Sequence, residues 1–265
     1  MESSLPQSDR PVETAAGHWV LARAGKRVLR PGGLKLTKAM LAAAKLPGAR
    51  VVEFAPGLGR TAQLIVAESI ASYVGVDRDV NAVSRVQRIV SGANGKVVCA
   101  NAAETGLPDD SADVVVGEAM LTMQGRKSKQ KIVAEAKRVL SVGGRYAIHE
   151  LALVPDGIEA SKADELRKTL ARVIRVNARP LTAAEWKELL TGAGFRVTEV
   201  ATAPMALLDP KRVVADEGLL GTLRIVRNLM RDKDLRARVL QMRRTFTEYK
   251  KNLAGITVVA TLDEK

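Results

Sequence analysis

The sequence predicts an α/β fold in which helices cover both faces of a mostly parallel β-sheet. Two observations predict it. Short apolar runs alternate with helix-like stretches between about residues 50 and 200, which is the pattern of strand–helix–strand units. A glycine-containing turn follows the first apolar run directly, where such folds pass from strand to helix. We therefore expect a doubly wound, seven-stranded sheet with helices before it and a helical insertion before its last strand.

The strands are predicted from short runs of β-branched and other apolar residues. Parallel strands buried on both faces show such near-continuous runs. In chain order the expected strands span 51–54, 73–76, 96–100, 114–117, 145–153, 195–200 and 256–262.

The helices between these strands are predicted at 58–68, 80–90 and 129–140, the last stopped by Gly143 and Gly144. A further helix has a complete start signal in LTAAEW. Thr182 can cap it, Glu185 completes a capping box, and Leu181 with Trp186 can form a hydrophobic staple.

The two ends of the chain add helices outside this alternation. Residues 12–46 predict two helices with a turn at RPGG (30–33), and residues 209–250 predict a helical pair that starts at Asp209-Pro210. The pair carries two apolar stripes, Leu219, Leu223, Val226 and Met230 on one helix and Leu235, Val239, Met242, Phe246 and Tyr249 on the other. We expect a helical lid (1–48), a cofactor-binding core (49–202), a helical cap (203–252) and a closing strand with its tail (253–265).

The charge of the chain is unevenly distributed. Residues 1–50 and 203–265 together carry +11 of the formal +13. A basic surface concentrates anionic partners, such as nucleic acid, an anionic small molecule or a lipid, although solvated helix faces explain the charge equally well.

Several classes of protein are disfavoured by composition. Cys99 is the only cysteine and His18 and His149 are the only histidines, so we expect neither disulfides nor a metal site. The start MESSLPQSDRPVE lacks a secretory pattern. No apolar run reaches about 18 residues. We expect a cytoplasmic protein without a membrane span.

The stretch VVEFAPGLGRTA (51–62) has two interpretations. From Gly57 it fits the G-x-G-x-x-A pattern of nicotinamide enzymes. From Glu53 it is an acidic residue before a small-residue loop, where a carboxylate suits an aminoalkyl sulfonium ligand and would repel a pyrophosphate. Asp77, after the second strand, can accept both ribose hydroxyls of either cofactor, and Arg78 could bind a 2′-phosphate, so NADP stays open on these residues.

Three later passages resemble class I S-adenosylmethionine-dependent methyltransferases, which have a Rossmann-like fold. They are CANAAETGLPDDSADVVVGEAML (99–121), EAKRVLSVGGRYAI (135–148) and LTAAEWKELLTGAGFRV (181–197). With the Glu53 loop and Asp77 they make five ordered matches over about residues 50–200. The sequence is most similar to methyltransferase type 11, the branch that modifies quinones and small molecules.

The resemblance implies S-adenosylmethionine as the cofactor and S-adenosylhomocysteine as the product. The implied cofactor contacts come from the loop after the first strand, the end of the second and the turns after the third and fourth: Glu53, Ala55, Pro56, Gly57, Gly59, Asp77, Arg78, Asn101, Ala102 and Glu118. Ala55 replaces a family glycine, Asn101 replaces an aspartate and Val142 replaces a proline. An asparagine oxygen can still accept the hydrogen bond of an adenine amino group.

Methyl transfer from a sulfonium needs placement of the acceptor more than a dedicated catalytic group. The candidates for a general base are His149, Glu150, Glu118 and His18. His149 and Glu150 are neighbours on the fifth strand, so strand alternation lets only one of them face the site. We predict a small-molecule acceptor, anionic or lipophilic. The basic segment GRKSKQK (125–131) either attracts a carboxylate, phosphate or nucleic acid or is the solvated start of a helix.

Three alternatives differ in class. The charge favours an RNA or other nucleic-acid methyltransferase, but the fourth strand ends in GEAML without an Asn/Asp-Pro-Pro-aromatic motif, and aromatic residues make up only 3% of the chain. A non-catalytic adenosine-ligand-binding protein and an NADP-dependent oxidoreductase are the other two.

Overall fold

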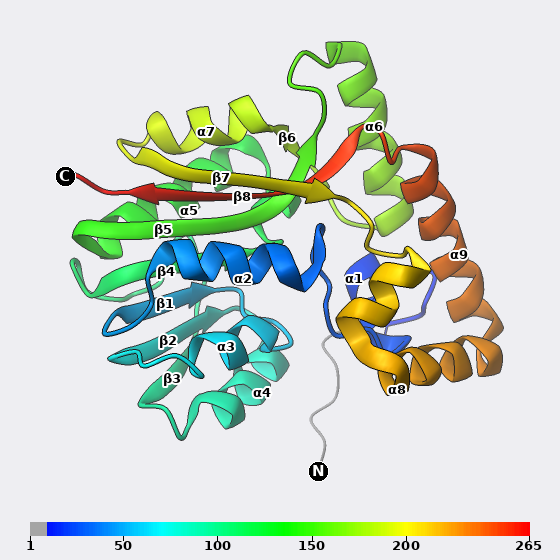
Figure 1. The fold of residues 1–265 in the computed structure, drawn as a ribbon, viewed down its shortest axis with the longest axis horizontal. Coiled ribbons are helices and arrows are strands. Elements are labelled where there is room, and N and C mark those ends of the chain that lie inside the picture. The colour runs from blue at the N-terminus through cyan, green and yellow to red at the C-terminus, as the bar shows by residue number, and fades with distance from the viewer. Residues whose placement is uncertain (1–9) are drawn as a thin grey trace.

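The computed structural model describes residues 10–265 and is built around one β-sheet (Figure 1). Its strands are β1 (Arg50–Phe54), β2 (Ser72–Asp77), β3 (Gly95–Cys99), β4 (Ala112–Glu118), β5 (Leu140–Leu153), β6 (Leu181–Thr182), β7 (Arg196–Pro204) and β8 (Leu253–Thr261).

The sheet has the order β3-β2-β1-β4-β5-β8-β7 among the described residues, with the two-residue β6 pairing beside β5. β8 runs antiparallel to both β5 and β7, whereas the pairs from β3 to β5 are parallel. The predicted doubly wound, mostly parallel sheet is confirmed, and its main path has the seven expected strands.

Helices cover both faces of the sheet. One face carries α2 (Gly33–Ala44), α3 (Arg60–Ile65) and α4 (Val80–Val90), and the other carries α5 (Arg126–Val139) and α7 (Ala183–Thr191) (Figure 1). Strand alternation divides the core accordingly. Val51 packs with the α2 side, and Val52 packs with the α5 and α7 side.

A helical cap lies beyond the end of the sheet where the parallel strands terminate (Figure 1). It consists of α1 (Gly17–Arg23), α6 (Ala160–Ile174), α8 (Pro210–Arg231) and α9 (Lys233–Glu248). Residues of α1, α6 and α9 share a third apolar core with the ends of β5 and β8. The cap therefore stands over the edge of the sheet where the predicted site residues lie.

The start signals of two helices are confirmed. Thr182 accepts the backbone N–H of Glu185, whose side chain accepts the N–H of Thr182, which completes the capping box of α7. Asp209 caps α8 just before Pro210.

Three elements differ from expectation. The helix α6 was not predicted, although its buried residues Ala163, Leu166, Leu170 and Val173 recur at helical spacing. The helix α2 falls within the expected lid but packs on the sheet. The predicted stripe of α9 is buried, but that of α8 is exposed.

No helix within residues 10–265 has the length and apolar character needed to cross a bilayer. The cytoplasmic location stays a prediction.

Candidate functional site

The loop after β1 has the backbone shape of a close-approach turn. Ala55, Gly57 and Gly59 have positive φ values of 53°, 54° and 74°. A Cβ atom on Gly59 would lie 2.5 Å from Ile89 Cδ1 of α4, and together with the positive φ this close approach favours glycine. A Cβ atom on Gly57 would meet nothing closer than Ala55 O at 3.8 Å and Trp19 Cη2 at 4.0 Å. The open space beside Gly57 leaves room for a ligand against the backbone, and the buried Pro56 holds the loop.

Asp77 closes this loop from the end of β2. Its Oδ2 accepts the N–H of Gly57 at 3.1 Å, and its Oδ1 accepts the N–H of Asp79 at 3.0 Å. Each carboxylate oxygen keeps a lone pair for another donor, such as a ribose hydroxyl. Burial raises the pKa of Asp77, although these backbone hydrogen bonds oppose the shift. The neighbouring Arg78 is exposed.

Glu53 lies at the end of β1 and is 2% exposed. The hydroxyl of Tyr73 on β2 donates to Glu53 Oε2 at 2.6 Å. Burial raises the pKa of Glu53 to about 8, against the lowering effect of the Tyr73 hydrogen bond. A neutral carboxyl group of this kind ionises when a cation binds beside it, because opposite charge favours the carboxylate.

The turn after β3 brings the predicted adenine contacts to the same edge. Asp77 pairs with Cys99 in the sheet register, two residues before Asn101. Asn101 is exposed and its Oδ1 accepts the N–H of Ala103 at 3.0 Å, which leaves a second lone pair on that oxygen. Ala102 packs partly buried against the core.

Glu118, at the end of β4, is the centre of a buried polar cluster. Its Oε1 accepts the hydroxyl of Thr37 at 2.6 Å and lies 2.8 Å from His149 Nδ1. Its Oε2 accepts Arg30 Nη1 at 2.5 Å and the hydroxyl of Thr61. Burial alone would raise the pKa of Glu118, but the Arg30 charge and the hydrogen bonds lower it to about 2. Its side chain is thus engaged by four protein groups, and the predicted methionyl contact at this position stays a prediction.

Arg30 is the charged residue of this cluster that the sequence did not single out. It stands in the predicted turn between α1 and α2 and is 4% exposed. Its guanidinium also donates to the hydroxyls of Thr37 and Thr61, both at 2.9 Å. Arg30 therefore ties the N-terminal segment to the ends of the strands. No local pattern identifies it, because its acidic partner lies 88 positions later.

The N-terminal helix α1 supplies two aromatic rings near the loop. His18 and Trp19 are half-buried, with ring centroids 4.6 Å apart. The tip of Trp19 is the side chain nearest to the open space at Gly57. Burial lowers the pKa of His18 to about 4, so this imidazole is neutral at pH 7. Residues 17–33, which carry these two rings and Arg30, are called the lid below.

His149 is completely buried on the α2 side of β5. Its Nε2 lies 2.5 Å from Pro31 O, and its Nδ1 faces Glu118 and Thr37. Both ring nitrogens are engaged by the protein. This geometry assigns the imidazole to holding the lid, and its action as a base stays a prediction.

Glu150 faces the opposite side of β5, as strand alternation requires. Its carboxylate accepts the backbone N–H groups of Met120, Leu121 and Thr122 at 3.0, 2.7 and 2.9 Å, and the Thr122 hydroxyl at 2.7 Å. Burial raises its pKa, against these hydrogen bonds. Glu150 fixes the turn after β4, and a direct catalytic role for it stays a prediction.

The basic segment 125–131 divides into exposed and buried parts. Arg126 and Lys127 are exposed at the start of α5. Lys129 is 2% exposed, and its ammonium group donates to the carbonyls of Gln124 and Arg179, each at 2.8 Å. Burial lowers the pKa of Lys129 to about 8. Lys129 therefore anchors two loops, and only its exposed neighbours are available to an approaching anion.

A sheet of this order, with an open glycine loop after β1 and an acidic residue ending β2, defines the Rossmann-like class that binds an adenosine ligand. The family model described as "Methyltransferase domain" matches residues 52–148. A protein of Haemophilus influenzae described as "Uncharacterized protein" is 36% identical over 248 residues, which cover 91% of this chain and 96% of that protein.

Two solved structures illustrate the shared fold. The [4+2]-cyclase SpnF superposes with a TM-score of 0.66 at 15% identity, covering 94% of this chain and 96% of its own. A Haemonchus contortus phosphoethanolamine N-methyltransferase 2, in complex with phosphomonomethylethanolamine and S-adenosylhomocysteine, superposes with a TM-score of 0.67 at 16% identity, covering 94% of this chain and 57% of its own. These comparisons identify a methyltransferase domain over residues 52–148 and a Rossmann-like fold shared with both solved structures.

Proposed function

We propose that this methyltransferase acts on a small acceptor, lipophilic or anionic, inside a site closed by the lid. The observation that supports this is the buried contact between Arg30 of the lid and Glu118 at the end of β4. A lid fastened there encloses the ends of the strands, which suits a small molecule better than a polymer.

The residues present fit the cofactor. When bound, S-adenosylmethionine supplies a methyl group on a sulfonium that is already a good leaving group. The open face of Gly57 admits the ligand against the backbone. Asp77 would accept the ribose hydroxyls, the Asn101 turn would meet the adenine, and Glu53 would offer a carboxylate to the cationic aminoalkyl end.

The contribution of the protein to the reaction is placement and exclusion of water. Holding the acceptor on the methyl axis replaces a bimolecular encounter by an oriented one. Trp19 covers the loop, with the His18 ring beside it. These roles follow from the position of the lid.

Calorimetric titration tests the cofactor roles. We expect saturable binding of S-adenosylhomocysteine and no binding of NADPH. Asp77→Asn should weaken S-adenosylhomocysteine binding at least about tenfold, because one charged acceptor of ribose hydrogen bonds is lost. Asp79→Asn is the matched control, since it removes a neighbouring charge but asparagine still caps α4. Equal affinity of the Asp77 variant and the wild type would remove Asp77 from the site.

A nucleic-acid acceptor is the second candidate, and one observation favours it. Twelve lysines and arginines against five acidic residues lie in residues 210–251, many of them exposed. Binding of RNA with a salt dependence equivalent to several phosphate contacts, together with methyl incorporation into RNA, would replace the small-molecule proposal.

A further inference from the structure

The outer face of α8 is an apolar surface that no part of residues 10–265 covers. Its side chains are large, and most are more exposed than in a packed helix: Leu219 (73%), Leu220 (81%), Leu223 (64%), Val226 (47%) and Met230 (72%). Four of them, at 219, 223, 226 and 230, recur at helical spacing and so form one stripe. Exposed apolar patches of this kind mark interaction sites.

The inner face of the same helix is engaged with the lid. Glu217 accepts the backbone N–H groups of Arg27 and Val28, both at 2.9 Å, and pairs with the buried Lys26. Asn228 donates to the carbonyl of Ala24 at 3.2 Å, and Ile225 is buried. The helix is therefore fixed by its polar inner contacts, and its apolar stripe is directed outward.

A backbone break separates the two parts of α8. Gly218 has φ 71° and ψ 175°, which are not helical angles. The residue before it fastens the lid, and the residue after it starts the apolar stripe. Since glycine adopts this conformation without steric cost, the break lets residues 219–231 take a different direction from residues 210–217.

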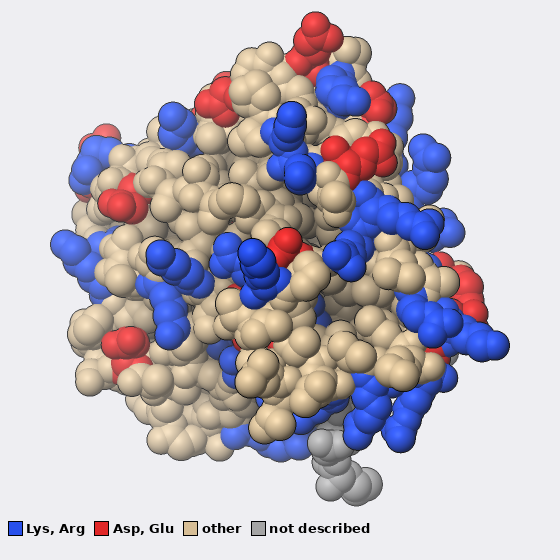
Figure 2. Space-filling view, turned by 45° about the vertical axis from the view of Figure 1, so that its right-hand side comes forward, with Lys and Arg blue, Asp and Glu red and all other residues tan. Residues whose placement is uncertain are grey.

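Basic residues flank the stripe. Arg224, Arg227 and Arg231 are exposed, and residues 219–231 contain no acidic residue. Exposed lysines and arginines continue along α9, where Lys233, Arg236, Leu240 and Arg244 line a shallow hollow. The nearest acidic residues in sequence are Glu217, which binds the lid, and Asp232, which caps α9. Figure 2 shows lysines and arginines gathered on this side of the molecule.

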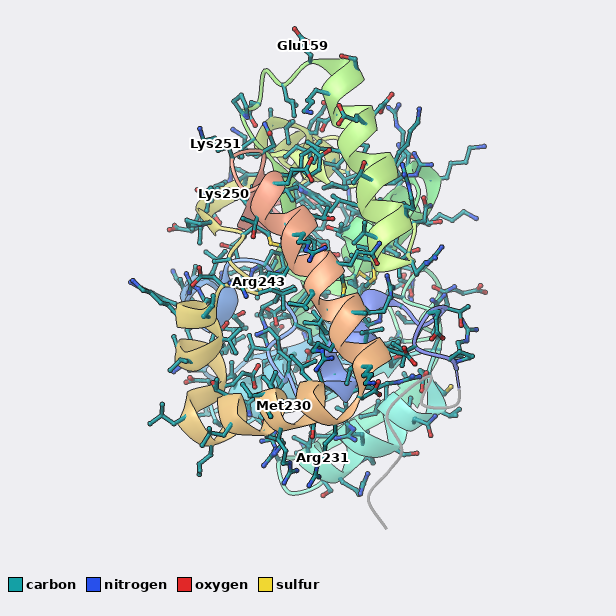
Figure 3. The ribbon with its side chains drawn as sticks, turned by 90° about the vertical axis from the view of Figure 1, so that its right-hand side faces the viewer. Glu159, Met230, Arg231, Arg243, Lys250 and Lys251 are labelled. Atoms are coloured by element: carbon teal, nitrogen blue, oxygen red, sulfur yellow. The ribbon has the colours of Figure 1, made fainter. Side chains whose placement is uncertain are left out.

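Figure 3 shows how the two helices present this surface. Met230 and Arg231 lie at the end of α8 where α9 begins, and Arg243, Lys250 and Lys251 follow along α9 and the turn after it. Apolar side chains on a convex helix beside long basic side chains are suited to the boundary between lipid headgroups and acyl chains. A protein groove would have to match five protruding side chains, whereas a lipid surface adapts to them.

We propose that the outer face of α8, with the flanking arginines, docks on an anionic lipid surface. The apolar stripe inserts among the acyl chains near the headgroups, and the arginines contact lipid phosphates. Docking brings the lid, which contacts the inner face of α8, close to that surface. This favours a lipophilic acceptor delivered from the lipid, a consequence that rests on the proposed function. The docking itself needs neither cofactor nor acceptor.

Co-sedimentation with vesicles tests the proposal. The full chain is incubated with vesicles of phosphatidylglycerol and phosphatidylcholine, and separately with phosphatidylcholine alone. We expect binding to the anionic vesicles and at least about tenfold weaker binding to the neutral ones, because each basic residue contributes to anionic-surface binding. Equal binding to both vesicle types, or no binding to either, would overturn the proposal.

Two variants separate the contributions. L220Q/L223Q/M230Q should reduce binding to anionic vesicles at least about tenfold, since it removes the inserting side chains. R224Q/R227Q/R231Q should reduce it about a hundredfold. Because all six positions are exposed, both variants should keep the melting temperature of the wild type, and this is measured first.

The charge control is K131Q/K168Q/K187Q, which removes three exposed lysines on other helices and should retain more than half of the binding. An equal loss in this control would mean attraction by net charge alone and would refute a local docking face. Sedimentation velocity without lipid tests whether the stripe is instead a dimer interface. A wild-type dimer that L220Q/L223Q/M230Q dissociates would assign the stripe to a second copy of the chain and overturn the proposal. Methyl transfer is measured separately with soluble acceptors. If no transfer is detected, the vesicle experiment still tests the docking proposal.

Discussion

His149 Nδ1 and Glu118 Oε1 lie 2.8 Å apart on neighbouring parallel strands, and each residue also holds the lid. Glu118 accepts from Arg30, and His149 Nε2 lies 2.5 Å from the carbonyl of Pro31. The pair thus links the centre of the sheet to the segment that covers it. The stability of the protein and the closure of its site therefore depend on the same buried hydrogen bonds.

Replacing Arg30 should be strongly destabilising. Arg30→Gln leaves the buried Glu118 without its charged partner, and we expect a loss of about 3 kcal/mol in the free energy of unfolding. Arg196→Gln is the matched control, because the Arg196–Asp263 pair is exposed and such pairs contribute at most about 1 kcal/mol. Urea denaturation measures both variants. Similar losses in the two would mean that the Arg30 pair is no more than a surface contact.

The low pKa of Glu118 predicts a component of acid unfolding. The folded-state pKa of about 2 lies below the value of an unfolded glutamate, about 4.3. The carboxylate therefore contributes stability that is fully present above about pH 5 and is lost as the pH falls towards 2. That contribution is about 3 kcal/mol. Glu118→Gln should flatten the unfolding free energy over this range, whereas the exposed Glu199→Gln should leave its slope unchanged.

The raised pKa of Glu53 predicts that cofactor binding strengthens with pH. A cationic aminoalkyl group requires the carboxylate, so affinity for S-adenosylhomocysteine should rise about tenfold per pH unit below pH 8 and level off above it. Tyr73→Phe removes the hydrogen bond that favours the carboxylate and should move this midpoint to higher pH. Tyr146→Phe is the control, since the buried Tyr146 hydroxyl has no hydrogen-bond partner among the described residues. A midpoint that stays in place in Tyr73→Phe would exclude this coupling.

His149→Gln distinguishes a structural role from a catalytic one. If the imidazole only holds the lid, the variant should lose about 2 kcal/mol of stability while kcat changes less than about fivefold. A base would instead lower kcat by about a hundredfold or more and remove the acidic limb of the pH–rate profile. We expect the first result, because both ring nitrogens of His149 contact protein atoms. Steady-state kinetics across pH, with any acceptor found, separates the two.

Glu150→Gln should loosen the turn after β4. The amide offers one acceptor oxygen and one donor group to four donors that now meet a carboxylate, so we expect a loss of about 2 kcal/mol. If Glu150 acts by positioning, KM for the acceptor should rise more than kcat falls. Amide hydrogen exchange at residues 120–122 should accelerate in the variant, and unchanged exchange would contradict the positioning role.

The sequence predicted the elements whose signals are local. The cap of α7 depends on residues three positions apart, and the strands depend on consecutive apolar residues. It did not single out Arg30, because the acidic partner that makes this arginine important is distant in the chain. It also could not show that the stripe of α8 is exposed, since periodicity defines an apolar face but not what covers that face. Glu53 and Asp77 lie at the edge of the sheet, as predicted. The hydrogen bond from Tyr73 to Glu53 could not be predicted, because it depends on the register of β1 with β2.

β8 is the last strand in the chain but lies between β5 and β7 in the sheet, so the order of the strands in space differs from their order in sequence. β7 precedes β8 in sequence, yet its ladder partner in the sheet is β8. β8 must itself find β5 about a hundred residues earlier, with Arg145 opposite Thr261. Closing so long a loop is slow compared with local pairing. β7 therefore joins the sheet only through a strand that follows it in the chain.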